Sequence, residues 1–223
     1  MLFRSQADSQ LPSAFERAYA DSEALVMEID LDDLDPATAV AWMMQNGVSA
    51  DGATLRETLG EPLHARVASA AGELGLPIEG LQQFEPWVIT LTLVERAYAK
   101  AGFDTESGVE KQLARRAGTD KKPITGLETL EQQLGALDSL SMKEQRAFLE
   151  QTVSELGSLE EETRDLFVAW RSGDAKRLGA LLTDEFKGYP ALYRALVTQR
   201  NEQWIPQTIW RSEERRVGKE CRS

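Results

Sequence analysis

Residues 24–31 read Ala-Leu-Val-Met-Glu-Ile-Asp-Leu, a short and nearly continuous apolar run. Such a run predicts a buried β-strand. A second run, Lys-Pro-Ile-Thr-Gly-Leu-Glu at residues 122–128, is bounded by proline and glycine and predicts another strand. Because long helical stretches separate the two runs, we expect the strands to pair in parallel. Two short strands are not stable alone, so helices must cover them.

Most of the remaining sequence has the i, i+3, i+4 apolar spacing of amphipathic helices. Asp35 and Pro36 combine an N-cap residue with proline at the first helical position. Helices are expected near residues 11–22, 36–47, 54–59, 62–75, 85–100, 108–117, 130–182 with breaks near 140, 157 and 173, and 190–209. The predicted fold class is therefore α/β. It is mostly helical, with a small and incomplete central parallel or mixed sheet, near 24–31 and 123–128, flanked by helices.

The last thirteen residues, 211–223, differ from the rest of the chain. They read Arg-Ser-Glu-Glu-Arg-Arg-Val-Gly-Lys-Glu-Cys-Arg-Ser, lack apolar periodicity and contain the only cysteine, Cys221. Over their whole length they resemble the conceptual translation of a sequencing adapter. A genuine basic tail is the alternative. We interpret residues 1–210 as a single domain and 211–223 as an artefactual or disordered tail, left out of fold reasoning.

The charge balance excludes some classes of partner. The chain carries 25 Lys and Arg against 37 Asp and Glu, a net charge of −12. The tail holds five of the basic and three of the acidic residues, so the preceding 210 residues carry −14. This argues against nucleic acid and against docking on anionic lipid. No apolar run is long enough to span a membrane, and no signal peptide is recognisable, so the compartment stays open.

Glu28 is the first candidate functional residue, because it interrupts an apolar strand. Burying an unpaired carboxylate is costly. One interpretation is that strand alternation turns Glu28 outward, or that the strand ends there. The other is a metal ligand or general base at the carboxyl end of a parallel strand, where open α/β sheets bind ligands.

Glu128 ends the second strand in the same way, so the two carboxylates could face one site. The alternative is that Glu128 caps the helix that starts near Leu130. Arg200, followed by Asn201 on the last helix, could clamp a carboxylate on the sheet or a substrate anion. It could equally be a solvated helix arginine.

Other types of site are poorly supported. His64 is the only histidine and has no companion at helical spacing, so we interpret it as structural or surface. The aspartates at 30, 32, 33 and 35 lack the spacing of a calcium loop and predict a solvated acidic turn. There is no serine–histidine–aspartate set, no CxxC and no P-loop.

Taken together and in order, these segments resemble the TraB/PrgY/GumN family, whose animal relatives are the Tiki proteins. Two departures are Glu85 for the usual lysine and Glu110 for the usual aspartate. The segments that carry the resemblance are Leu11-Pro12, Ala-Asp-Ser-Glu-Ala-Leu-Val-Met-Glu-Ile-Asp at 20–30, Thr54-Leu55, Pro86-Trp87, Gly108-Val109-Glu110, Gly-Leu-Glu-Thr at 126–129, Trp170, Gly173-Asp174, and Arg200-Asn201 with Trp204.

The resemblance implies an α/β fold and, in Tiki members, a metal-dependent peptidase. The family site uses two Gly-x-x-His motifs and the strand glutamate. The first motif would end at or before Met1 and the second would follow Trp210, so we expect a chain truncated at both ends. Glu28 (catalytic and metal-binding) and Arg200 (catalytic) carry over as site residues, with Glu128 and Asn201 as substrate-binding residues. A divalent manganese, cobalt or zinc ion is implied for the parent protein, and none is expected to bind tightly here.

Two functions remain open. The parent protein is expected to be a metal-dependent, peptidase-like hydrolase, and this chain to be inactive without both histidine motifs. The alternative is a non-catalytic, regulatory protein that binds a peptide on the same fold. A peptide or protein substrate is the expected partner, and the oligomeric state is open. Family members are often periplasmic or membrane-anchored, and the targeting segment would lie before Met1.

Overall fold

A two-stranded parallel sheet lies among the helices, as the two apolar runs predict. The structure is a computed structural model that describes residues 11–31, 35–103, 108–184 and 186–220. Strands β1 (Leu25–Met27) and β2 (Ile124–Gly126) pair with Leu25 opposite Ile124 and Met27 opposite Gly126. Both strands are shorter than the apolar runs that predicted them. The parallel pairing and the mostly helical α/β class are confirmed.

The helices begin and end close to the positions that capping residues indicate. The described helical elements are α1 (Ser13–Asp21), α2 (Pro36–Asn46), α3 (Leu55–Leu59), α4 (Glu61–Glu73), the 3-10 turn η2 (Ile78–Leu81), α5 (Pro86–Lys100), α6 (Val109–Asp120), α7 (Leu130–Asp138), α8 (Met142–Glu155), α9 (Leu159–Ser172), α10 (Ala175–Asp184), α11 (Pro190–Tyr193), the π-helical turn η4 (Arg194–Thr198) and α12 (Gln199–Glu220). Asp35 caps α2 by accepting a hydrogen bond from the Ala37 amide, with Pro36 at the first helical position. Complete capping boxes start α3, α7 and α8, each with a Ser or Thr side chain and a Glu or Gln three residues later.

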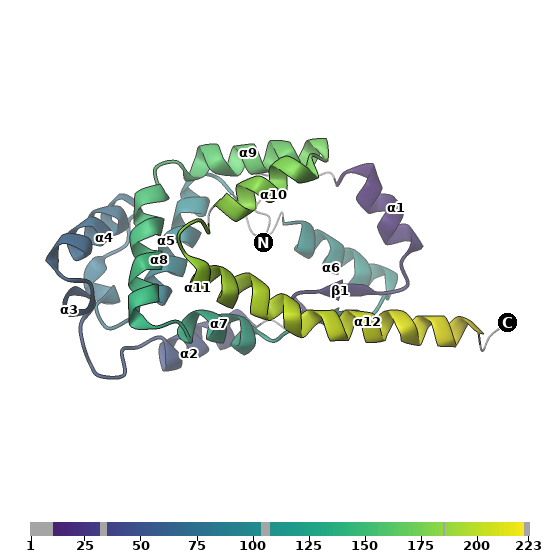
Figure 1. The fold of residues 1–223 in the computed structure, drawn as a ribbon, viewed down its shortest axis with the longest axis horizontal. Helices are drawn as coiled ribbons and strands as arrows, with labels where there is room; N and C mark the ends of the chain where they lie inside the picture. Colours follow the sequence, from purple (N-terminus) through teal and green to yellow (C-terminus); the bar gives the residue numbers. More distant parts are fainter. Residues whose placement is uncertain (1–10, 32–34, 104–107, 185, 221–223) are drawn as a thin grey trace.

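The apolar core has two parts that meet along α5. One part packs α3, α4, α5 and α8 together, around Leu55, Val67, Leu93 and Leu149. The other packs α5, α7 and the segment from α11 to η4 together, around Trp87. Helices α5 and α8 lie side by side at the centre of the helical end of the molecule (Figure 1). Trp87 is completely buried, so the Pro86-Trp87 start of α5 anchors the second part of the core.

The sheet lies at the other end, among α6, α7 and α12. Helix α6 packs on β1, and α2 packs on α7. The long helix α12 passes alongside the sheet (Figure 1), where Gln207 donates a hydrogen bond to the Leu127 carbonyl at 2.9 Å. The sheet therefore sits where chain segments from both halves of the sequence converge.

The last helix begins with an irregular turn. Between α11 and α12, the π-helical turn η4 replaces regular α-helix, and such turns occur often at functional sites. Helix α12 continues past Trp210 to Glu220, although its expected end was near Ile209. That residues 211–223 are a cloning artefact stays a prediction. Across the described ranges, no helix combines the length and hydropathy that crossing a bilayer requires.

Candidate functional site

The two strand-end glutamates lie next to each other. Glu28 directly follows β1, and Glu128 comes two residues after the end of β2. The Leu127 amide donates to the Met27 carbonyl at 2.9 Å, and the Glu128 amide donates to the Glu28 carbonyl at 3.0 Å. These bonds extend the parallel ladder beyond the strands, so both carboxylates emerge at the carboxyl edge of the sheet. This is the edge at which α/β sheets bind ligands.

Arg200 joins the two carboxylates. Its Nε donates to Glu128 Oε2 at 3.1 Å and its Nη2 to Glu128 Oε1 at 2.5 Å, which is a bidentate pair. Nη2 also forms an ion pair with Glu28 Oε1. Nη1 donates to the Leu196 carbonyl at 3.1 Å, one turn earlier in the chain. Glu28, Glu128 and Arg200 together are called the carboxylate–arginine cluster below.

Polar side chains from two helices complete the cluster. The Trp204 indole N–H donates to Glu128 Oε2 at 3.3 Å, and its ring lies 4.8 Å from the Arg200 guanidinium. The Gln133 amide on α7 donates to Glu28 Oε1 at 3.2 Å. Sequence reasoning missed Gln133 and Gln207. A usable signal existed for Gln207, because residues 200, 204 and 207 share one face of a helix.

The two carboxylates differ in exposure. The Glu128 side chain is 2% exposed and that of Arg200 15%, whereas the Glu28 side chain is 42% exposed. Burial raises the pKa of the Glu128 carboxyl, and hydrogen bonds from Trp204 and Gln133 act in the opposite direction. Burial also lowers the pKa of the Arg200 guanidinium. The Glu128–Arg200 pair is therefore largely buried, and Glu28 is the carboxylate of the cluster that solvent reaches.

The other predicted residues occupy separate places. Asn201 is exposed on α12, and Thr129 rather than Glu128 is the N-cap of α7. The capping alternative for Glu128 is therefore wrong, and its side chain faces Arg200 instead. His64 is buried on α4 and lies 2.9 Å from the Gln82 amide nitrogen, so the surface alternative is wrong. Of the acidic turn, Asp32 and Asp33 lie outside the described residues.

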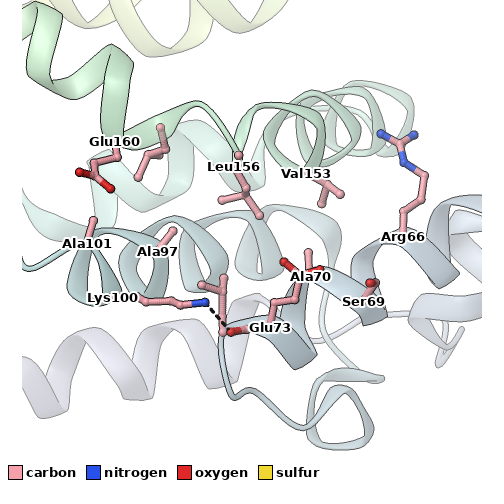
Figure 2. Close-up of a pocket in the computed structure, with 13 residues that line it drawn as sticks. Arg66, Ser69, Ala70, Glu73, Ala97, Lys100, Ala101, Val153, Leu156 and Glu160 are labelled. Carbon is pink, nitrogen blue, oxygen red and sulfur yellow. Dashed lines mark hydrogen bonds between the residues drawn. The ribbon is translucent and has the colours of Figure 1, made fainter.

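A cavity of about 500 Å³ lies elsewhere, between α4, α5 and the start of α9 (Figure 2). Figure 2 shows Lys100 reaching from α5 to the end of α4, where it donates to the Glu73 carbonyl at 2.9 Å. Arg66 on its rim pairs with Glu150 at 2.9 Å. None of its lining residues belongs to the carboxylate–arginine cluster. A smaller cavity of about 430 Å³ lies beside the carboxylate–arginine cluster and is lined by Glu128 and by all three residues of β2, but not by Glu28 or Arg200.

Comparison with known proteins agrees with the order of motifs. The model of the TraB/PrgY/gumN family matches residues 3–217, which is nearly the whole chain. The chain belongs to the TraB/PrgY/gumN family. No curated protein and no solved structure matches the chain significantly. The site of this TraB/PrgY/gumN protein therefore has to be understood from its own residues.

The metal implied by the family resemblance does not fit the residues that this structure describes. Glu28 and Glu128 flank a guanidinium, which occupies the place between the two carboxylates. Within the described ranges, no group of three or more His, Cys, Asp and Glu side chains could hold a metal ion. The chain's one histidine, His64, is in the core on α4. A manganese, cobalt or zinc ion would need further donors.

Proposed function

We propose that this TraB/PrgY/gumN protein is a peptide-directed hydrolase in which Glu28 is the reacting carboxylate. The observation that supports this most directly is the contrast between the two glutamates. Both stand at the carboxyl edge of the sheet, but the Glu28 side chain is 42% exposed and that of Glu128 only 2%. A carboxylate that takes part in the reaction must be accessible to the substrate, whereas a carboxylate that only binds an arginine can be buried.

In this proposal, Arg200 and Gln133 position Glu28. Both contact the same oxygen, Oε1. Among the described residues, Oε2 of Glu28 has no hydrogen-bond partner. That oxygen would accept a proton from a water molecule as the water oxygen bonds to the peptide carbonyl carbon. The carbon–nitrogen bond then breaks, and the proton passes to the departing amine. General-base assistance of this kind contributes about 10²–10⁴-fold to a rate.

The donor set of the described residues does not fit a metal ion. We therefore expect the 223-residue chain alone to show no metal-dependent turnover.

The test is cleavage of an unstructured peptide mixture by the protein, followed by mass spectrometry, with and without added manganese, cobalt or zinc. Glu28→Gln should lower kcat/KM by about 10²–10⁴-fold. Glu23→Gln removes an exposed carboxylate just before the same strand and should leave kcat/KM unchanged. Turnover that survives Glu28→Gln would sink the proposal.

A second candidate is non-catalytic peptide binding, as in a regulatory protein. One observation favours it. The Arg200 guanidinium already contacts both carboxylates and the Leu196 carbonyl. A bound arginine is less available to stabilise developing negative charge. Under this alternative, peptide binding survives EDTA and is insensitive to Glu28→Gln. Loss of binding on chelation would exclude it.

A further inference from the structure

We propose that the free edge of β2 accepts an extended, positively charged peptide as an added strand. This inference rests on the proposed function only in taking the ligand to be a peptide. It concerns how that peptide is held and which charge it carries. Strand addition to an exposed sheet edge is a common mode of peptide recognition, in which main-chain hydrogen bonds supply the affinity.

The ladder between the strands shows which peptide groups are free. The Leu25 amide donates to the Pro123 carbonyl at 2.9 Å, and the Leu127 amide donates to the Met27 carbonyl at 2.9 Å. With Leu25 opposite Ile124, the groups of Ile124 and Gly126 point away from β1. Within the described part of the chain, the N–H and C=O groups of these two residues have no hydrogen-bond partner. They form a short row of donors and acceptors that a further strand would satisfy.

Space for a ligand lies along this strand. The cavity of about 430 Å³ is lined by all three residues of β2 and by the start of α7, including Leu130. Its volume is within the range of ligand sites in proteins, about 300–1,000 Å³. Strand β1 is instead packed against α6. We therefore place the added strand at β2, directly beside Glu128.

The charge of the cavity indicates which kind of peptide would bind there. The charged side chains from the described residues that line the cavity are all carboxylates, Asp30, Asp35, Glu128 and Glu131. Glu128 is compensated by Arg200, and the exposed carboxylates of Asp35 and Glu131 contribute negative potential to the cavity. The whole chain carries −12, so a second copy would be repelled at this edge. An extended peptide with lysine or arginine side chains complements it.

The experiment uses the whole chain and a capped pentapeptide of alternating lysine and valine. Two matched peptides serve as controls, one with glutamate for lysine and one with N-methylated backbone amides. At saturation with the lysine peptide, amide hydrogen exchange at Ile124 and Gly126 should slow by about tenfold or more, because new hydrogen bonds protect them. The glutamate and N-methylated peptides should each bind about tenfold more weakly.

Variants of exposed residues test the charge without disturbing the fold. Glu131→Gln should weaken lysine-peptide binding about threefold at low salt, and less at high salt because of screening. Glu161→Gln changes an exposed residue on α9 and should leave lysine-peptide binding unchanged. Binding without protection of Ile124 and Gly126 would overturn the edge assignment but not peptide binding itself. Protection that grows with protein concentration alone would show that a second copy takes the edge. Absence of any peptide binding would instead count against the proposed function.

Discussion

The guanidinium of Arg200 grips the carboxylate of Glu128, which lies 72 positions earlier in the chain, through Nε–Oε2 and Nη2–Oε1 distances of 3.1 and 2.5 Å. This pair fastens the last helix to the end of the second strand. Arg200 also forms an ion pair with Glu28, so a single arginine contacts both carboxylates. The site and the attachment of the last helix to the sheet therefore share the same contact.

Breaking this buried pair should destabilise the protein strongly. Arg200→Met leaves the Glu128 carboxylate buried without its partner, and loss of one partner of a buried ion pair costs about 3–5 kcal/mol. The double variant Arg200→Met with Glu128→Leu should recover part of the loss, because no charge is then stranded. Urea unfolding measures the free energy of unfolding for each. Arg194→Met, an exposed arginine of η4, is the control and should change it by less than about 0.5 kcal/mol. A double variant no more stable than Arg200→Met would contradict the coupling.

Trp204 should tune the titration of Glu128. Its indole N–H donates to Oε2 at 3.3 Å, and this hydrogen bond lowers the pKa of the Glu128 carboxyl against the effect of burial. Trp204→Phe removes the donor and keeps an aromatic ring near Arg200, so the pKa of Glu128 should rise further. Carbon-13 NMR of the glutamate carboxyls measures it. An unchanged or lower pKa would show that the indole does not contact Glu128 in solution.

Acid should weaken the starts of α3 and α8. The backbone and side-chain hydrogen bonds from Thr54 lower the pKa of Glu57, and those from Ser141 lower the pKa of Glu144. A carboxyl whose pKa is lower in the folded state stabilises that state above its unfolded value, about 4.3. This stability is lost as the pH falls through the folded value. In each of the variants Glu57→Gln and Glu144→Gln, the slope of the unfolding free energy against pH should be smaller than in the unmodified protein below about pH 4.3. A slope identical to that of the unmodified protein would contradict this.

Two glycines should respond in opposite directions to replacement by alanine. A Cβ at Gly47 would clash with the Val88 side chain and lie 2.7 Å from the Met43 carbonyl oxygen. Gly47→Ala should therefore destabilise the protein by about 1–3 kcal/mol. Gly72 is inside α4, where a Cβ meets nothing within 4 Å. Gly72→Ala should stabilise it by about 0.5–1 kcal/mol. Thermal unfolding of both variants tests the pair, and a stable Gly47→Ala protein would show that α2 can shift away from α5.

Much of the site could be predicted because its residues stand at positions that local sequence marks. Glu28 and Glu128 end apolar runs, and parallel pairing follows from the helices between them. Asp35 and Pro36 start α2 as their residue types indicate. Gln133 could not be predicted, because its contact with Glu28 spans 105 positions and depends on how α7 packs beside the sheet. The π-helical turn before α12 left no recognisable sequence signal either.

The sequence by itself determined the strands, most helix boundaries, the acidic character and the family, because these follow from local apolar spacing, capping residues and ordered motifs. Only the tertiary structure decided how exposed each of the two glutamates is. They have the same local setting in the sequence, yet Arg200 and Trp204 bury Glu128 while Glu28 stays half-exposed. Burial depends on which distant segments pack over a side chain. The packing of α12 against the sheet therefore makes one carboxylate buried and leaves the other exposed.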